Sequence, residues 1–170
     1  MRFLLIALAL LAPLPTFAQS GPVTPSGKLP PANPLPYDDP EATAVMVPVN
    51  ALFAAFNAED GVGVLAQTRP EGVLLVVDEL PDGSRKIFTM GWAKLASVLK
   101  PGPNRNEERL GMPAIEIDGD IAMVWAPYVN YRNGKADHCG IDLMDMVREN
   151  GAWKVLNITS SHRNTGCLPQ

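Results

Sequence analysis

The sequence has 170 residues and a formal net charge of −4, from 14 Lys and Arg against 18 Asp and Glu. Its basic residues are scattered singly or in pairs, so it lacks the basic face of a protein that binds nucleic acid or an anionic membrane surface. A chain of this length fits one domain with a single sizeable core.

The first 18 residues have the pattern of a secretory signal peptide. Arg2 precedes an apolar run over residues 3–11, prolines follow, and Thr16-Phe17-Ala18 forms a small-x-Ala cleavage site. The alternative, a membrane-spanning helix, needs about 20 apolar residues, roughly twice this run. The cleavage site has no nearby cysteine that could carry a lipid. We therefore expect cleavage after Ala18 and a periplasmic or secreted protein without a membrane anchor.

Residues 19–40 contain seven prolines with Ser, Gly and Asn between them. This composition is typical of an extended, poorly ordered arm. A docking motif for a partner is the alternative to a spacer, and we favour the spacer. The folded domain is predicted over residues 41–162, with a C-terminal tail over residues 163–170.

Helices are predicted first in the folded domain. Asp39-Pro40-Glu41 has an acidic N-cap followed by proline, which is typical of a helix start. Apolar residues at helical spacing follow, namely Val45, Val49, Leu52, Phe53 and Phe56. Asp60-Gly61 ends this helix and caps a short second one that reaches about Gln67. Strands over residues 72–79 and 85–89 then flank a turn, and a third helix over residues 90–100 carries Trp92.

A four-stranded antiparallel meander is predicted over residues 112–117, 121–131, 136–148 and 152–159. Three pairs that favour two-residue type I′ turns separate these strands: Asp118-Gly119, Asn133-Gly134 and Asn150-Gly151. Three helices against one twisted antiparallel sheet give an α+β domain, in which the curved sheet encloses a cone-shaped pocket.

The turns also predict the strand register. With two-residue loops and no bulge, Trp125 lies opposite Asp142, and Asp142 lies opposite Thr159. The next row on this face holds Met123, Met144 and Asn157, and His138 lies on the same face. We expect these side chains to line a ligand pocket that is closed by Phe53, Phe56 and Trp92 from the helices.

The opposite face is predicted to be the outer one, and Tyr128 is predicted to point outward on it. Its aliphatic centre is formed by Val124, Ile141, Leu143 and Ile158. This apolar surface is too large to remain exposed to solvent, so we expect a homodimer that forms through the outer face of the sheet.

Several segments resemble the SnoaL-like branch of the nuclear transport factor 2-like superfamily. The resemblance covers residues 41–159, and it rests on residues 118–128, on Gly134-Lys135, on His138-Cys139-Gly140-Ile141-Asp142, on Trp153-Lys154-Val155 and on residues 48–53 before Asp60-Gly61. It implies an α+β cone, frequently dimeric through the outer sheet face. The superfamily includes dehydratases, isomerases, cyclases and non-catalytic binding domains, so the fold alone does not choose a function. Met144 occupies a position that is often aromatic in the family.

Asp142 and His138 are the candidate catalytic residues. A carboxylate in an apolar pocket has its charged form disfavoured, which tunes a general base towards neutral pH. The alternative is a structural role, in which Asp142 accepts hydrogen bonds that hold the sheet in register. Along one strand the two residues are about 13 Å apart, too far for a direct hydrogen bond.

No metal or cofactor site is predicted. Cys139 faces away from His138 and Asp142, so no tetrahedral ligand set closes, and no phosphate loop or dinucleotide fingerprint occurs. Cys139 and Cys167 are predicted to form a disulfide across the turn at Asn164-Thr165-Gly166 because an exported chain meets oxidising conditions. Two free thiols are the alternative.

Two functions remain open from the sequence. The first is an exported module that binds a small apolar or amphipathic molecule without turnover. The second is a cofactor-free hydratase, dehydratase or isomerase that uses Asp142 with help from His138. A second acid or a tyrosine that points into the pocket beside Asp142 would favour the enzyme, and we favour the binding module.

Overall fold

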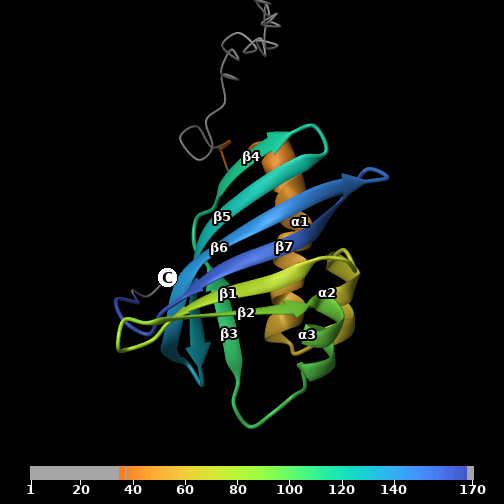
Figure 1. Ribbon diagram of the computed structural model, residues 1–170. Coiled ribbons are helices and arrows are strands. Elements are labelled where there is room, and N and C mark those ends of the chain that lie inside the picture. The colour runs from red at the N-terminus through yellow and green to blue at the C-terminus, as the bar shows by residue number, and fades with distance from the viewer. Residues whose placement is uncertain (1–34, 37, 168–170) are drawn as a thin grey trace, which may run out of the picture.

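The computed structural model describes residues 35–36 and 38–167. The predicted signal peptide and most of the proline-rich arm lie outside these residues. The described residues form three helices and seven strands, which are labelled in Figure 1. The helices are α1 (Pro40–Asn57), α2 (Gly61–Gln67) and α3 (Trp92–Val98). The strands are β1 (Val73–Glu79), β2 (Arg85–Gly91), β3 (Asn106–Leu110), β4 (Ala114–Asp118), β5 (Ile121–Arg132), β6 (Lys135–Glu149) and β7 (Ala152–His162).

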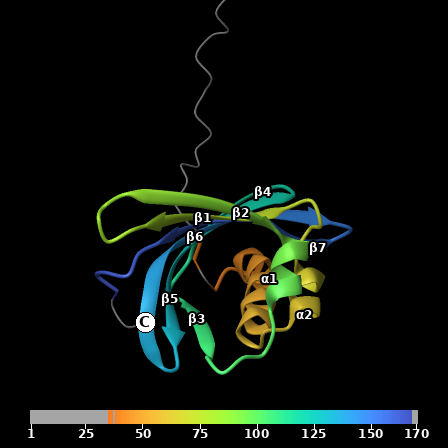
Figure 2. The same cartoon turned by 60° about the horizontal axis from the view of Figure 1, so that its bottom comes forward.

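The helices form a layer against one face of the sheet, and the sheet curves around α1 (Figure 2). Asp39 caps α1 by accepting hydrogen bonds from the backbone N–H of Glu41 at 2.8 Å and of Ala42 at 3.4 Å. Asp60 caps α2 in the same way, so both predicted helix starts are confirmed. Within the described part of the chain, no helix has the length and apolarity needed to cross a membrane.

The sheet has the strand order β2-β1-β7-β6-β5-β3, and β4 pairs with β5 beside β3. All of these pairs are antiparallel except β1 with β7, which run parallel. The predicted α+β class with three helices on a curved, mostly antiparallel sheet is therefore confirmed. Strand β3 is not among the elements that the sequence predicts.

All three predicted hairpins are present, and two of their turns lie at the predicted residues. The first turn is shifted by one residue, because Asp118 pairs with Ile121 and leaves Gly119 and Asp120 as the loop. Asn133 and Gly134 have φ values of 52° and 79°, and Asn150 and Gly151 have values of 52° and 80°. Positive φ at both central residues is what a type I′ turn requires. Gly119 also has a positive φ, of 59°, in the turn between β4 and β5.

The predicted register is wrong by one residue because each long hairpin contains a β-bulge. Asn130 pairs with His138 while Tyr131 pairs with Ala136, which leaves Asp137 as an extra residue in β6. A second irregularity lies in β7, where Asn157 pairs with Asp145 and Val155 with Met146. Each extra residue shifts the pairing beyond it by one position.

The corrected register changes which residues share a face. Asp142 lies between Ala126 and Ser160, whereas Trp125 lies beside Leu143. The prediction that Val124 and Ile158 form the outer face is wrong: both are buried in the core with α1. Tyr128 was also predicted to point outward, but it lies on the concave face and is 3% exposed.

Candidate functional site

A cavity of about 220 Å³ opens between the concave face of the sheet and helices α1 and α3. Its walls are apolar, and they consist of Leu52, Phe53, Phe56, Leu74, Val76, Phe88, Trp92, Leu95 and Ile158. Its polar lining comes from four strands and comprises Glu108, Tyr128, His138, Asp142, Ser160 and His162. An apolar cleft with a few converging polar groups is the usual form of a small-molecule site.

Two carboxyl groups meet in this cavity. Asp142 comes from the middle of β6 and is 2% exposed, and Glu108 reaches it from the edge strand β3 by a side-chain hydrogen bond. Burial raises the pKa of Asp142 to about 7, although hydrogen bonds from Ser160 and Glu108 act in the opposite direction. Burial and the charge of Asp142 together raise the pKa of Glu108 well above its ordinary value. The pair therefore retains a shared proton near neutral pH.

Asn57, the last residue of α1, fixes the backbone of Glu108. Its Nδ2 donates to the Glu108 carbonyl at 2.9 Å, and its Oδ1 accepts from the Glu108 N–H at 2.7 Å. These are the two bonds that a neighbouring strand would otherwise make. The helix terminus thus positions the second carboxyl of the site through the main chain.

Replacing this amide is expected to loosen the edge strand. Asn57→Ala leaves two backbone groups of Glu108 without their partners and should lower the free energy of unfolding by about 1 to 2 kcal/mol, measured by urea denaturation. Asn164→Ala is the control, because the Asn164 Nδ2 bond to the Asp137 carbonyl is exposed. Equal stabilities of the two variants would contradict the positioning role of Asn57.

A hydroxyl network continues from the carboxyl pair. Ser160 hydrogen-bonds Asp142, its hydroxyl oxygen lies 3.4 Å from that of Tyr128, and Tyr128 donates to the Ser161 carbonyl at 3.0 Å. Burial raises the pKa of Tyr128, so its hydroxyl stays protonated. Gly140 allows β6 and the Ser161 backbone to lie close together, since a Cβ at position 140 would lie 1.7 Å from the Ser161 carbonyl oxygen.

A pair of histidines also lines the cavity. The rings of His138 and His162 are stacked at a tilt, with centroids 4.0 Å apart. The Nδ1 atom of His138 lies 3.0 Å from Asp137, and that of His162 lies 3.6 Å from Asp78. Burial and the neighbouring His138 lower the pKa of His162, which favours its neutral form.

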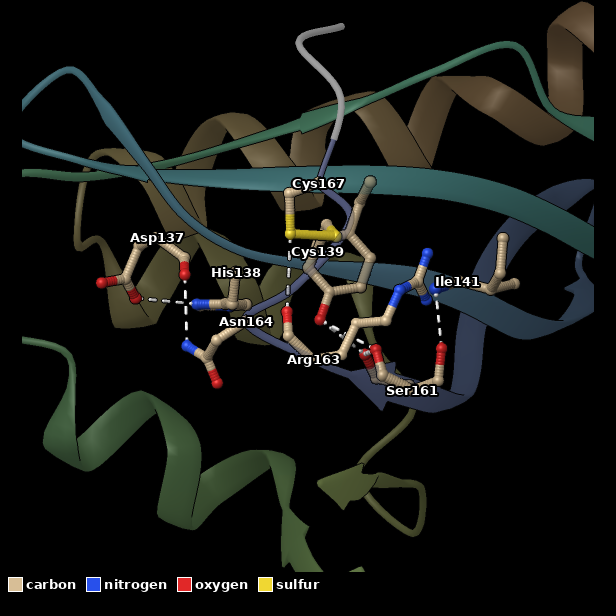
Figure 3. Close-up of a disulfide and its surroundings, with 10 residues drawn as sticks. Asp137, His138, Cys139, Ile141, Ser161, Arg163, Asn164 and Cys167 are labelled. Carbon is tan, nitrogen blue, oxygen red and sulfur yellow. Dashed lines mark hydrogen bonds and ion pairs between the residues drawn. A yellow bond between two sulfur atoms is a disulfide. The ribbon is translucent and has the colours of Figure 1, made fainter. Parts of the chain in front are cut away.

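The predicted disulfide is confirmed, and it lies directly beside this pair. Cys139 bonds to Cys167 with their Cα atoms 5.5 Å apart, and the Cys139 and Arg163 backbones exchange hydrogen bonds at 2.9 and 3.0 Å. Figure 3 shows the bridge next to His138, with Asn164 donating to the Asp137 carbonyl. The bridge thus fastens the segment after β7 to the strand that carries His138 and Asp142.

The structure brings together some of the predicted pocket residues and separates others. Phe53, Phe56 and Trp92 line the cavity together with Asp142 and His138. Met144 is fully buried in the core beneath them, and it is absent from the cavity wall.

The remaining predicted pocket residues lie on the outer face, because the bulges move the strands by one residue. They are Met123, Trp125, Asn157 and Thr159. Trp125 is 42% exposed. Asn157 bonds to the Val73 backbone and to Asp145 on that face.

Three polar residues of the site are not predicted from the sequence: Glu108, Ser160 and His162. The alternation in residues 106–110 carried a signal: Glu107 and Arg109 form an ion pair on one face of β3. Glu108 and Leu110, which alternate with them, therefore point to the other face. Across the described residues, no group of three or more His, Cys, Asp and Glu side chains could hold a metal ion.

No protein-family model matches the sequence, and no curated protein matches it either. Solved structures do match. An NTF2-like protein from Cytophaga hutchinsonii aligns with a TM-score of 0.58 at 13% identity, over 72% of this chain and 98% of that one. An NTF2-like protein with a cystatin-like fold from Novosphingobium aromaticivorans aligns with a TM-score of 0.58 at 12% identity, over 74% and 83%.

A third match is a ketosteroid isomerase-like protein from Erwinia carotovora. It aligns with a TM-score of 0.50 at 18% identity, over 73% of this chain and 97% of that one. At these identities the likeness concerns the fold, and the SnoaL-like branch stays a prediction. The chain has the nuclear transport factor 2-like fold.

Proposed function

We propose that this protein is an exported domain that binds a small apolar or amphipathic molecule in the cavity between the sheet and helices α1 and α3. The observation that carries the proposal is the carboxyl pair of Asp142 and Glu108, which lies within apolar walls. Apolar walls supply affinity by burying the body of a ligand, and the polar lining orients it. The NTF2-like and ketosteroid isomerase-like neighbours are consistent with a ligand-binding domain of this kind.

A thermal-shift screen of a metabolite library tests this function. A compound that binds only the folded protein raises its apparent stability by mass action, by about 2.7 kcal/mol at one hundred times the dissociation constant. The screen is repeated with Asp142→Asn, which keeps the side-chain volume but cannot ionise. We expect compounds that stabilise the wild type and lose affinity for the variant. A library without a stabilising compound would overturn the proposal.

A second candidate function uses the same groups for proton transfer without a cofactor. In a hydratase, dehydratase or isomerase, Asp142 would act as general base with help from His138. The structure supplies a second acid, Glu108, and a tyrosine, Tyr128, on the concave face beside Asp142. A carboxyl with a pKa of about 7 has the proton affinity that a general base needs near neutral pH.

Proton exchange separates the two functions. Compounds from the screen are incubated with the protein in D₂O and analysed by mass spectrometry. A base that removes a carbon-bound proton and returns a deuteron from solvent increases the mass of the compound. Exchange that is present in the wild type and absent in Asp142→Asn identifies catalysis. Binding without exchange identifies the non-catalytic domain.

The outer face of the sheet supports the proposed homodimer, with a corrected centre. Ile141 and Leu143 remain on this face, and Trp125 joins them. Figure 1 shows that the helices leave this side of the sheet uncovered. Ile87 at the edge strand β2 is 64% exposed and extends the apolar surface. A two-fold pairing of these surfaces would bury them in the middle of the interface.

Trp125→Glu is expected to weaken this dimer. Loss of a large aromatic side chain from the centre of an interface costs about 2 kcal/mol, or roughly a thirtyfold higher dissociation constant. Sedimentation velocity over a concentration series measures it. Val62→Glu is the control, because Val62 is 80% exposed on α2. A wild type that remains monomeric at high micromolar concentration would contradict the proposal.

A further inference from the structure

We propose that the ligand of this cavity is an organic amine, whose ammonium group binds Asp142 and Glu108 while its apolar body lies against the aromatic walls. This inference rests on the proposed binding function and specifies the class of ligand. It follows from three properties of the cavity: its charge balance, its missing hydrogen-bond donors and its aromatic lining.

The carboxyl groups of the cavity have no strongly basic side chain beside them. Asp142 and Glu108 are in contact, and no lysine or arginine is among the described residues that line the cavity. The two histidines of the lining each face a carboxylate of their own, Asp137 or Asp78. A buried charge without a counter-charge is costly. A ligand that carries a positive charge removes this cost on binding.

The polar end of the cavity has more hydrogen-bond acceptors than donors. Asn130, which lies beside Glu108 but outside the cavity lining, hydrogen-bonds Glu108 through its side chain, and its buried Oδ1 has no hydrogen-bond partner. The Tyr128 hydroxyl already donates to the Ser161 carbonyl, and the single proton of the Ser160 hydroxyl is shared among protein acceptors that include Asp142. An ammonium group brings three donors and no acceptor. A carboxylate or phosphate ligand would bring only acceptors and a repelling charge.

Aromatic side chains surround the remaining space. Phe53, Phe56, Phe88, Trp92 and Tyr128 come from four different elements of the fold. Aromatic faces attract ammonium groups and bury hydrocarbon at the same time, which is how proteins commonly bind organic cations. The same walls give little advantage to a small inorganic cation, because such an ion is too small to contact them.

Affinity for an amine should rise with pH between pH 6 and pH 8. The groups that face the carboxyl pair are Tyr128 from β5, His138 from β6, and Ser160 and His162 from β7, while α1 and α3 contribute apolar residues. Over this range Asp142, whose pKa is about 7, loses its proton. The negative charge that forms favours a bound cation, so binding near pH 7 should release protons.

Calorimetric titration with three compounds of matched body tests the inference: 2-phenylethylamine, 2-phenylethanol and 3-phenylpropanoate. At pH 8 the amine is expected to bind at least about tenfold more tightly than the alcohol, and the carboxylate should bind most weakly. Asp142→Asn should abolish the preference for the amine. Asp145→Asn should retain it, because Asp145 lies on the outer face and is exposed.

The outcomes separate this inference from the function on which it rests. Binding of the alcohol without preference for the amine overturns the amine inference and leaves the binding function intact. A preference that survives in Asp142→Asn also overturns it. If none of the three compounds binds, the charge of the compounds found by the thermal-shift screen tests the inference. Screen compounds that are neutral or anionic would contradict an amine ligand. Failure of every compound overturns both proposals.

Discussion

Removing the Cys139–Cys167 disulfide is expected to lower the free energy of unfolding by about 3 to 4 kcal/mol. The bridge joins residues 28 positions apart, and closing a loop of that length restricts the unfolded chain by about this amount in the chain-entropy model. Urea denaturation of the wild type and of Cys167→Ser measures the difference. Cys167 is chosen because Cys139 is only 3% exposed and its replacement would also disturb packing.

Reductant provides the control for this experiment. Dithiothreitol should lower the stability of the wild type to that of Cys167→Ser and should leave the variant unchanged. Mass spectrometry after alkylation identifies the state of the two thiols. Two alkylated cysteines in protein that has not been reduced would contradict the disulfide. If Cys167→Ser had the same free energy of unfolding as the wild type, the bridge would not stabilise the fold.

Between pH 5 and pH 8, the carboxyl pair is expected to reduce the stability of the wild type by a few kcal/mol. The folded-state pKa of Asp142 is raised to about 7, and that of Glu108 is raised as well. A carboxyl with a raised pKa binds its proton more tightly in the folded protein. Its contribution is therefore fully present below the unfolded pKa of about 4 and is lost as the pH rises to about 7.

The difference between wild type and Asp142→Asn isolates this effect. His162 acts in the opposite direction, since its lowered pKa costs stability as the pH falls below about 6.5, but it is present in both proteins. Asp142→Asn should therefore be more stable than the wild type at pH 8. The difference in the free energy of unfolding between the two proteins should become smaller towards pH 5. A difference that does not depend on pH would contradict a protonated carboxyl pair.

Local signals in the sequence predicted most of the fold. Asp39 and Asp60 specify helix starts, and Asn133-Gly134 and Asn150-Gly151 specify tight turns, because these positions have short-range conformational requirements. The parallel pairing of β1 with β7 depends on contacts between distant segments. Leu74 pairs with Ile158, and nothing near either residue indicates the other.

The candidate site was predicted only in part, for a physical reason. An error of one residue in register exchanges the two faces of a strand. The bulge at Asp137 has no neighbouring glycine to mark it, so the turn alone predicts Trp125, rather than Ala126, opposite Asp142. Residues from helices, such as Phe53 and Trp92, were unaffected because their orientation depends on helical spacing.

The parallel pairing of β1 with β7 also determines when this chain can fold during its synthesis. The Val73 N–H bonds to Asn157, 84 positions away, and the Trp92 indole bonds to the Leu156 carbonyl, 64 positions away. The helices and the β1-β2 hairpin therefore lack their sheet until the last strand has left the ribosome. Long-range pairing of this kind slows folding. For the proposed export, in which the chain would have to pass a translocation pore unfolded, this arrangement gives the nascent chain time.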